Sequence, residues 1–254
     1  MAFTIAFSGK GGTGKSTIAA LSVRYLTEEL KKTVLAVDAD PNSCLGMELG
    51  INVESTISDV REDVIKKKMD FPPGMSKEMY VDYCIEESIV EKDGYDLLTM
   101  GRPEGPKCYC YINNLLRKYL DKAASSYPYV VIDNEAGMEH LSRRTTNDVD
   151  ILFIVAEPTM AGIKTIDNIK IITDELPINI KRKAIILNRI HNGKINDKIK
   201  KKIDESGIEV VAQLPFDYEI IELSSDSKSM SFLSKENGIF KTIGKMIDEC
   251  INSA

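Results

Sequence analysis

The stretch GKGGTGKS, Gly9–Ser16, decides the fold of this chain. It fits the pattern G-x-x-x-x-G-K-[ST], in which glycines let backbone N–H groups turn inward around phosphates. Lys15 supplies a charge to the β- and γ-phosphates, and Ser16 offers its hydroxyl to Mg²⁺. The apolar run Phe3–Ser8 precedes the motif and a helical pattern follows it, which is the context that the motif requires. The sequence therefore predicts a nucleoside triphosphate site, whose loop residues are Gly9, Gly11, Gly12, Thr13, Gly14, Lys15, Ser16 and Thr17.

Two other interpretations of the same glycines are open. Gly9, Gly11 and Gly14 also spell G-x-G-x-x-G, and Asp38 ends the next apolar run, as in a dinucleotide site. A structural glycine-rich turn is the second alternative. The triphosphate interpretation is favoured because a dinucleotide site has no use for the Lys15-Ser16 pair. Nor does it need an acid at the end of YVVID, where Asp133 is suited to water-mediated support of Mg²⁺.

Short apolar runs alternate with helical patterns along the chain. The runs are mostly continuous, as in strands that are covered on both faces, and this order predicts an α/β fold with a doubly wound, mostly parallel sheet. Residues 52–94 are polar and charged, and we interpret them as an insertion between the second and third core strands of a single domain that spans 1–254. The expected strands are Phe3–Ser8, Thr33–Val37, Tyr95–Met100, Tyr129–Asp133, Ile151–Ala156, Ala184–Asn188 and Ile208–Leu214, and the expected helices are Lys15–Leu30, Ile112–Ala124, Gly162–Glu175 and Asn196–Ser206.

Composition excludes several classes of protein. With 28.3 kDa and 43% hydrophobic residues the chain can bury a full core. A net charge of -6 with scattered lysines lacks the basic footprint of a nucleic-acid binder. No apolar run approaches the roughly 18 residues that span a bilayer, and no leader precedes Phe3, so we expect a cytoplasmic protein that does not bind membranes. Five cysteines at irregular spacing do not form a secreted disulfide framework, so the thiols are expected to be reduced.

A second lysine in the loop, Lys10, gives the form K-G-G-x-G-K-[ST]. With it the sequence resembles the MinD, ParA and nitrogenase iron-protein superfamily, whose fold is that of a P-loop ATPase. The resemblance implies that Lys10 reaches the partner's phosphates across a nucleotide-sandwiched dimer. It also implies catalytic roles for Lys10, Lys15 and Asp40, of which Asp40, in VDADPN, would orient the attacking water. Asp38 would support the metal, Asn188 would read the adenine, and Pro215 would contact the base.

Each of these residues also has a purely structural interpretation. Lys10 could be a solvated lysine on a surface loop, and DADPN could be a turn after a strand. Asn188 and Pro215 could equally be turn formers at strand ends.

The segment after Asp133 departs from the usual D-T-x-x-G and reads Asp133-Asn134-Glu135-Ala136-Gly137. Together with CYC upstream and DADPNSCLG, this segment resembles the corresponding parts of the CooC-type ATPases, which include relatives called AcsF. The resemblance covers the whole chain. It implies a cytoplasmic homodimer that uses ATP and Mg²⁺ and supports nickel insertion into carbon monoxide dehydrogenase or acetyl-CoA synthase.

Cys108 and Cys110 are one residue apart, so in extended backbone their sulfurs point to the same side. Two thiolates do not complete the four-ligand sites that Zn²⁺ and Ni²⁺ prefer. A two-fold dimer would bring a second pair to its axis and complete one shared site. ATP that closes the dimer would then assemble the metal site. The alternative is that both cysteines are small buried hydrophobes.

Two further functional classes are open, an iron-protein-like ATP-dependent reductase and a MinD-like spatial regulator. The reductase needs a cysteine shortly after Asp133, and none follows until Cys250. The regulator needs a basic amphipathic tail, whereas GIFKTIGKMIDECINSA is near neutral.

Cys44 could be packed or reactive, and packing is favoured, whereas Cys84 and Cys250 are expected to be structural or surface thiols. His140 could approach the nucleotide or metal, but a lone histidine at a helix start is more often satisfied locally. His191, in a turn, gives no signal.

Overall fold

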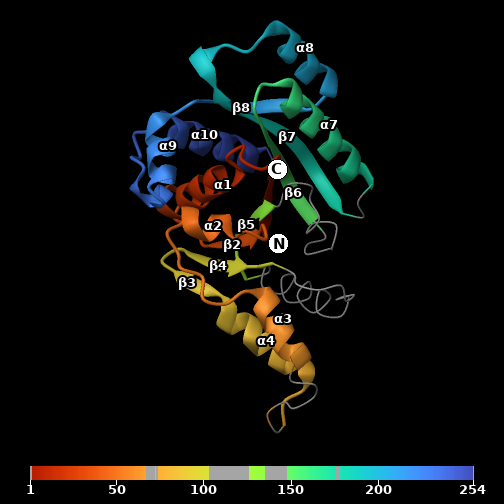
Figure 1. The fold of residues 1–254 in the computed structure, drawn as a ribbon, viewed down its shortest axis with the longest axis vertical. Helices are drawn as coiled ribbons and strands as arrows, with labels where there is room; N and C mark the ends of the chain where they lie inside the picture. Colours follow the sequence, from red (N-terminus) through yellow and green to blue (C-terminus); the bar gives the residue numbers. More distant parts are fainter. Residues whose placement is uncertain are drawn as a thin grey trace.

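The computed structural model describes residues 2–66, 72, 74–102, 126–134, 148–175 and 178–253. These residues build one eight-stranded sheet with helices on both faces (Figure 1), which confirms the expected doubly wound α/β fold. Several predicted features lie outside the described residues: the helix at 112–124, the cysteines Cys108 and Cys110, Gly137 and His140.

The sheet has the strand order β3-β4-β2-β5-β1-β6-β7-β8, and every pairing is parallel except that of β3 with β4. The first strand of the chain therefore lies in the interior of the sheet, between β5 and β6. From β1 the chain builds one side of the sheet with β2 to β5 and then the other side with β6, β7 and β8. The loop after β1 therefore opens at a topological switch point, where ligands bind in such sheets. The strands are β1 (Phe3–Gly9), β2 (Val34–Ala39), β3 (Val90–Lys92), β4 (Tyr95–Thr99), β5 (Tyr129–Asn134), β6 (Asp148–Ala156), β7 (Asn179–Ile190) and β8 (Glu209–Pro215).

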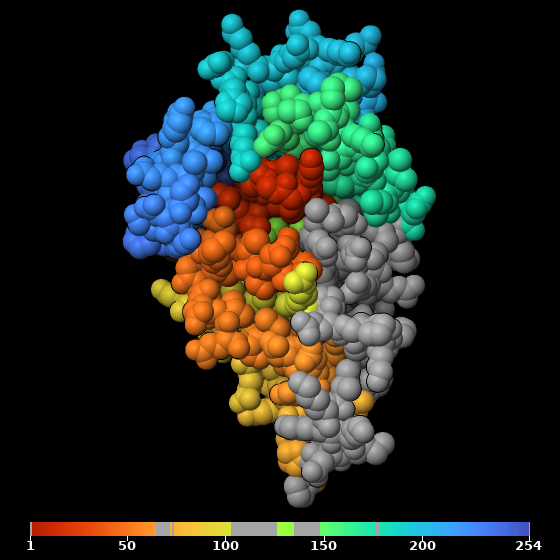
Figure 2. All heavy atoms as spheres, in the orientation of Figure 1, coloured from red at the N-terminus to blue at the C-terminus, as the bar shows by residue number. Residues whose placement is uncertain are grey.

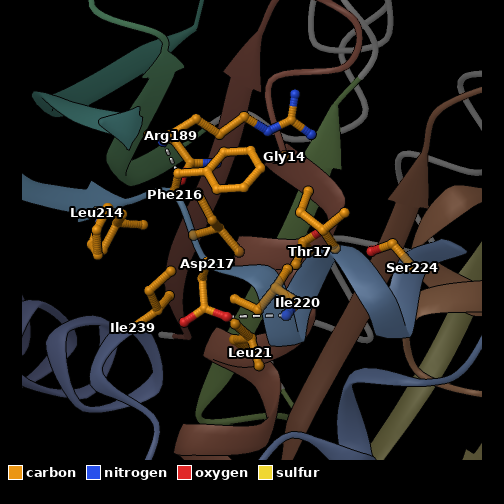
Figure 3. Close-up of a pocket in the computed structure, with 14 residues that line it drawn as sticks. Gly14, Thr17, Leu21, Arg189, Leu214, Phe216, Asp217, Ile220, Ser224 and Ile239 are labelled. Atoms are coloured by element: carbon orange, nitrogen blue, oxygen red, sulfur yellow. Dashed lines mark hydrogen bonds between the residues drawn. The ribbon is translucent and has the colours of Figure 1, made fainter. Parts of the chain in front are cut away.

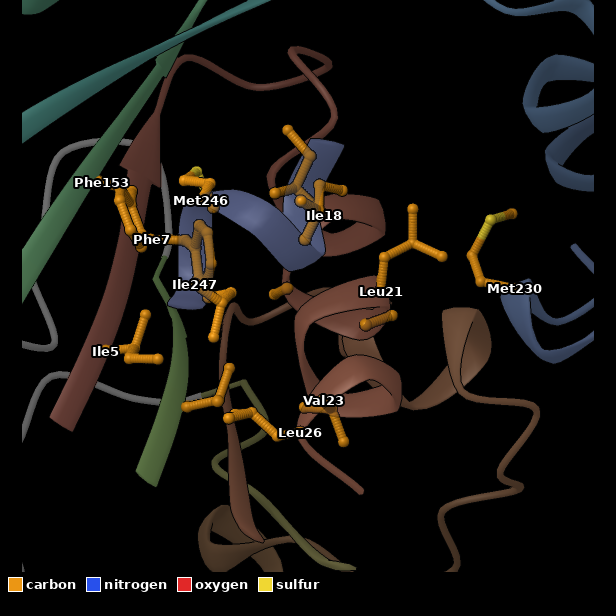
Figure 4. Close-up of a cluster of buried hydrophobic side chains, with 14 of the residues drawn as sticks. Ile5, Phe7, Ile18, Leu21, Val23, Leu26, Phe153, Met230, Met246 and Ile247 are labelled. Atoms are coloured by element: carbon orange, nitrogen blue, oxygen red, sulfur yellow. The ribbon is translucent and has the colours of Figure 1, made fainter. Parts of the chain in front are cut away.

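Alternate residues of β1 belong to two separate cores, one on each face of the sheet. Ile5 and Phe7 pack with α1 and α10, as Figure 4 shows, whereas Ala6 packs with residues of α3, α4, α7 and α8. Covering both faces explains why the strands read as continuous apolar runs. The helices are α1 (Lys15–Arg24), the π-helix η1 (Tyr25–Glu29), α2 (Cys44–Glu48), α3 (Ile57–Lys66), α4 (Lys77–Ser88), α7 (Met160–Glu175), the 3-10 helix η2 (His191–Gly193), α8 (Asp197–Ser206), α9 (Tyr218–Ser225), the 3-10 helix η3 (Met230–Phe232) and α10 (Gly238–Asn252).

Residues 52–94 hold two helices, α3 and α4, and the short strand β3, which was not predicted. β3 pairs antiparallel with β4 and forms one edge of the sheet. Whether this segment is an insertion relative to related proteins stays a prediction.

The last helix, α10, packs its apolar face onto the body of the protein. Phe240, Ile243 and Ile247 are buried in the core that also contains Ile18 and Leu21 of α1. A Cβ placed on Gly244 would lie 2.3 Å from the ring of Tyr25, so α10 and η1 touch closely there. The tail is therefore part of the folded core.

Across the described ranges, none of the helices has both the length and the apolar character that crossing a bilayer requires.

Candidate nucleotide site

The loop between β1 and α1 has a backbone that depends on its glycines. Gly14 has a φ of 89°, in the left-handed region, and a Cβ there would lie 2.5 Å from Nδ2 of Asn188. A Cβ on Gly9 would lie 2.2 Å from the carbonyl oxygen of Val155 on β6. The loop is therefore held against the ends of the neighbouring strands, in a conformation that larger residues resist.

The two lysines of the loop have different environments. Lys15 is 5% exposed and its Nζ donates to the carbonyl oxygen of Lys10 at 3.4 Å. Thr13 donates to the same oxygen through Oγ1 at 2.8 Å. Lys10 itself is exposed. In Figure 2 the N-terminal residues, in red, reach the surface in the middle of the face shown, between α7 in green and the orange segment that contains α2. The structure thus places one lysine inside the loop and the other on its outer surface.

Two aspartates end the strands beside the loop. Asp38 of β2 and Asp133 of β5 are register partners, and Asp133 is also the partner of Phe7 on β1. Both carboxyl groups are fully buried. Asp38 accepts hydrogen bonds through Oδ2 from the backbone N–H groups of Leu45 at 2.8 Å and Gly46 at 3.3 Å, at the start of α2. Asp38 therefore links the carboxyl end of β2 to the start of α2.

Asp133 has no such partners. Neither of its carboxyl oxygens accepts a hydrogen bond of good geometry from any described residue. Burial raises the pKa of Asp133 to about 7, although the nearby Ser16 hydroxyl and the Lys15 ammonium offset part of the rise. Burial likewise raises the pKa of Asp38 to about 6, against the effect of its N–H donors. A buried carboxyl group without donors is stabilised by a cation or a bound water.

The donor set at this point fits Mg²⁺. The Ser16 hydroxyl and the Asp133 carboxylate are hard oxygen ligands of the kind that Mg²⁺ takes directly or through water. When bound, the ion would neutralise charge on the phosphates. In the described part of the chain, this site included, no three His, Cys, Asp or Glu side chains gather closely enough to hold a metal ion by themselves.

Asp40 follows β2 and heads a tight turn. Its Oδ1 accepts from the backbone N–H and from the side-chain amide of Asn42, both at 2.9 Å. Its own N–H donates to Oδ1 of Asp38 at 3.2 Å. The turn that the sequence suggested is therefore present, and it places Asp40 next to the buried Asp38. The proposed role of Asp40 in orienting water stays a prediction.

An open cleft lies beside the loop, between the loop, the ends of β7 and β8, and α9. Asn188 and Pro215, the residues that the sequence suggested for the base, both line it, together with Gly14 and Thr17 of the loop. Asn188 Nδ2 donates to the carbonyl oxygen of Thr13 at 2.8 Å, so the end of β7 is bonded to the phosphate loop. The structure brings these predicted residues to one cleft.

Sequence reasoning missed other residues of this cleft. Figure 3 shows Arg189 and Phe216 above Thr17 and Ile220, at the mouth of the cleft. Phe216 stacks on His191, with ring centroids 4.8 Å apart, so this histidine has a packing role. Arg189 has a φ of 57° and its Nη1 bonds Oε1 of Glu157 at 3.2 Å. Phe216 directly follows Pro215 in the segment LPFD, so the prediction made for the proline could have included this ring, which lines the cleft beside it.

The described residues include three free cysteines, Cys44, Cys84 and Cys250, none of which is fully exposed. Cys44 is half-buried beside the aspartates, and burial with the charges of Asp40, Asp38 and Asp133 raises its pKa to about 11. Cys250 is buried in α10 and Cys84 is half-buried in α4. Burial also raises the pKa of Cys250, so the thiols of Cys44 and Cys250 stay protonated and are poor nucleophiles or ligands.

Comparison with known proteins agrees with this geometry. Residues 4–230 match the family described as CobQ/CobB/MinD/ParA nucleotide binding domain. An uncharacterized ATP-binding protein of Methanocaldococcus jannaschii is 38% identical, over 98% of each chain. The carbon monoxide dehydrogenase accessory protein CooC of Rhodospirillum rubrum is 31% identical, over 85% of this chain and 84% of its own. The cell division protein MinD of Aquifex aeolicus has a similar structure, with a TM-score of 0.73, 21% identity, and coverage of 100% of this chain and 98% of MinD.

The chain therefore belongs to the CobQ/CobB/MinD/ParA family of nucleotide-binding domains. Its class, a P-loop protein of the MinD and ParA type, is shown by the match over most of the chain and by the shared fold.

Proposed function

We propose that this protein is an ATP-hydrolysing metallochaperone that acts as a homodimer and supports nickel insertion into carbon monoxide dehydrogenase or acetyl-CoA synthase. The observation that carries the ATPase part is the buried, donor-free carboxyl group of Asp133 beside Lys15 and Ser16. Lys15 and the loop N–H groups would hold the phosphates, Asp40 would orient the attacking water, and Lys10 would reach the partner's nucleotide. Phosphoryl transfer needs mainly positioning and charge, which these residues supply.

The nickel part rests on two observations together. The relative from Rhodospirillum rubrum, named for carbon monoxide dehydrogenase, matches over most of both chains, and this sequence contains the pair Cys108 and Cys110. Four thiolates from two protomers would suit Ni²⁺ or Zn²⁺. Nucleotide binding that closes the dimer would thereby raise the affinity for metal.

The alternative of a MinD-like spatial regulator is disfavoured by α10. Its apolar face is buried against α1 and the sheet, so this helix does not offer that face to a membrane.

The test is a titration of Ni²⁺ and Zn²⁺ into reduced protein under anaerobic conditions, with and without ADP or ATP, combined with a mass measurement. One metal per dimer, lost in Cys108→Ala/Cys110→Ala and shifted by nucleotide, is the expected result. Cys84→Ala and Cys250→Ala are the matched controls, which should bind metal normally. Equal metal binding by all variants, or binding by monomers, would contradict the metallochaperone role, whereas ATP hydrolysis by the wild type tests the ATPase role separately.

A further inference from the structure

Glu48, the last residue of α2, contacts the phosphate loop directly. Its Oε1 accepts a hydrogen bond from Oγ1 of Thr17 at 3.0 Å. Thr17 is one of the loop residues, and it lines the cleft beside Gly14. Glu48 is separated from Thr17 by 31 positions and belongs to no motif of the sequence.

The end of α2 is held in place, so Glu48 cannot easily turn away. Ser229 donates through Oγ to the carbonyl oxygen of Glu48 at 3.0 Å. Gly50, with a φ of 72°, lies so close to Ser229 that a Cβ on it would be 2.8 Å from the Ser229 Cβ. At its other end α2 is bonded to Asp38 through the N–H groups of Leu45 and Gly46. The five-residue helix is thus fixed at both ends. Asp38 accepts from its first residues, and Glu48 at its end accepts from Thr17.

A hydroxyl group has one proton to donate. In this structure the proton of Thr17 goes to Glu48, so a phosphate that uses the same donor must take it from the carboxylate. A phosphate oxygen accepting from Thr17 would lie about 3 Å from Oγ1, hence within about 6 Å of the Glu48 carboxylate. Two negative charges at that separation repel in a half-buried site. Burial raises the pKa of Glu48, which is consistent with a carboxylate that lacks a cationic partner.

We propose that Glu48 is a positioning residue that holds the Thr17 hydroxyl before a phosphate binds, opposes anionic ligands there, and so links phosphate binding to α2. The ligand class is a nucleoside polyphosphate or inorganic polyphosphate. The inference rests on the proposed nucleotide binding.

The test measures the affinities of ATP, ADP and inorganic tripolyphosphate for Glu48→Gln by calorimetry at pH 8 with Mg²⁺. Glutamine keeps the acceptor for Thr17 and removes the charge. We expect Glu48→Gln to bind all three ligands three- to tenfold more tightly, with the largest gain for the most highly charged ligand. Glu205→Gln, the same change at an exposed position of α8, should bind as the wild type does.

Two further variants examine the contact from the side of the loop. Thr17→Val removes the hydroxyl and should bind polyphosphates at least fivefold more weakly, and Thr17→Ser, which keeps the hydroxyl, should restore much of the binding that Thr17→Val loses. These variants also serve if Glu48→Gln fails to fold. Unchanged or weaker binding by a folded Glu48→Gln, or normal binding by Thr17→Val, would overturn the inference. Failure of the wild type to bind any of the three ligands would overturn the proposed nucleotide function, and the inference with it.

Discussion

Asp38 and Asp133 occupy directly paired positions at the carboxyl ends of β2 and β5, yet only Asp38 accepts hydrogen bonds of good geometry from the described residues. Asp38 fixes α2, whereas Asp133 lies near the Ser16 hydroxyl and the Lys15 ammonium. Two identical side chains in equivalent places thus have separate tasks, one structural and one directed at the phosphate site.

The first prediction concerns Asp133→Asn. Because the pKa of Asp133 is raised in the folded protein, its contribution to stability is most favourable below the ordinary carboxyl pKa and is lost as the pH rises through about 7. Without metal or nucleotide, Asp133→Asn should therefore be more stable than the wild type by about 1–3 kcal/mol at pH 8, with a smaller gain at pH 5. Denaturant unfolding at several pH values in a chelator checks this.

The same variant should lose most of its ATP hydrolysis, because it loses the charge that supports Mg²⁺. Asp204→Asn, an exposed position, is the control and should change stability by less than about 0.5 kcal/mol at any pH. A change in the free energy of unfolding of equal size in Asp133→Asn and Asp204→Asn would show that loss of a negative charge, and not burial of the carboxyl group, is responsible.

Lys15→Ala and Lys10→Ala should differ in kind. Lys15 is buried in the loop, so its loss should weaken ATP binding and lower hydrolysis by roughly two orders of magnitude or more. Lys10 is exposed, so Lys10→Ala should bind ATP nearly normally and lose hydrolysis only, together with any ATP-dependent dimer. Calorimetry, phosphate release and light scattering on both variants separate these outcomes, and equal ATP affinities for the two variants would contradict the assignment.

Gly14→Ala should destabilise the protein by about 1–3 kcal/mol, because it imposes a side chain on a left-handed φ and pushes against Asn188. Gly11→Ala is the matched control, since a Cβ at Gly11 meets nothing within 4 Å. Its free energy of unfolding should change by less than about 0.5 kcal/mol. Thermal unfolding without nucleotide measures both, and a tolerated Gly14→Ala would mean that the loop relaxes freely.

Phe216→Ala should weaken ATP binding about tenfold, since an aromatic face at the cleft mouth is lost. Binding of inorganic tripolyphosphate should not change, because that ligand has no base. Tyr83→Ala removes an aromatic ring of α4 that is 48% exposed and does not line the cleft, so it should leave both affinities unaltered. A loss of tripolyphosphate binding in Phe216→Ala would place this ring at the phosphates instead.

The phosphate loop and the sheet could be predicted because the residues that specify each element are close together in the sequence. Glycine spacing, a lysine-serine pair and a preceding apolar run are all readable within sixteen residues. The strand ends were less readable. β6 begins at Asp148, three residues before the apolar run, because Asp148 and Asp150 hide its start in the pattern. β3 is only three residues long and carries Glu91 and Lys92, so no apolar pattern announces it.

The contacts that hold the site together could not be predicted, because they join distant segments. Asn188 reaches Thr13 across 175 positions, and Glu48 reaches Thr17 across 31. Neither donor nor acceptor stands in a pattern that specifies its partner. The parallel sheet brings them together, so their roles emerge only from the register of the strands.

The position of β1 between β5 and β6 also determines when the phosphate loop can fold during synthesis of the chain. The loop residues are synthesised more than a hundred residues before the strands on either side of them, at 129–134 and 148–156. Domains fold during synthesis as they emerge. The loop must therefore wait for these strands, and a phosphate ligand can bind there only after β6 has been translated.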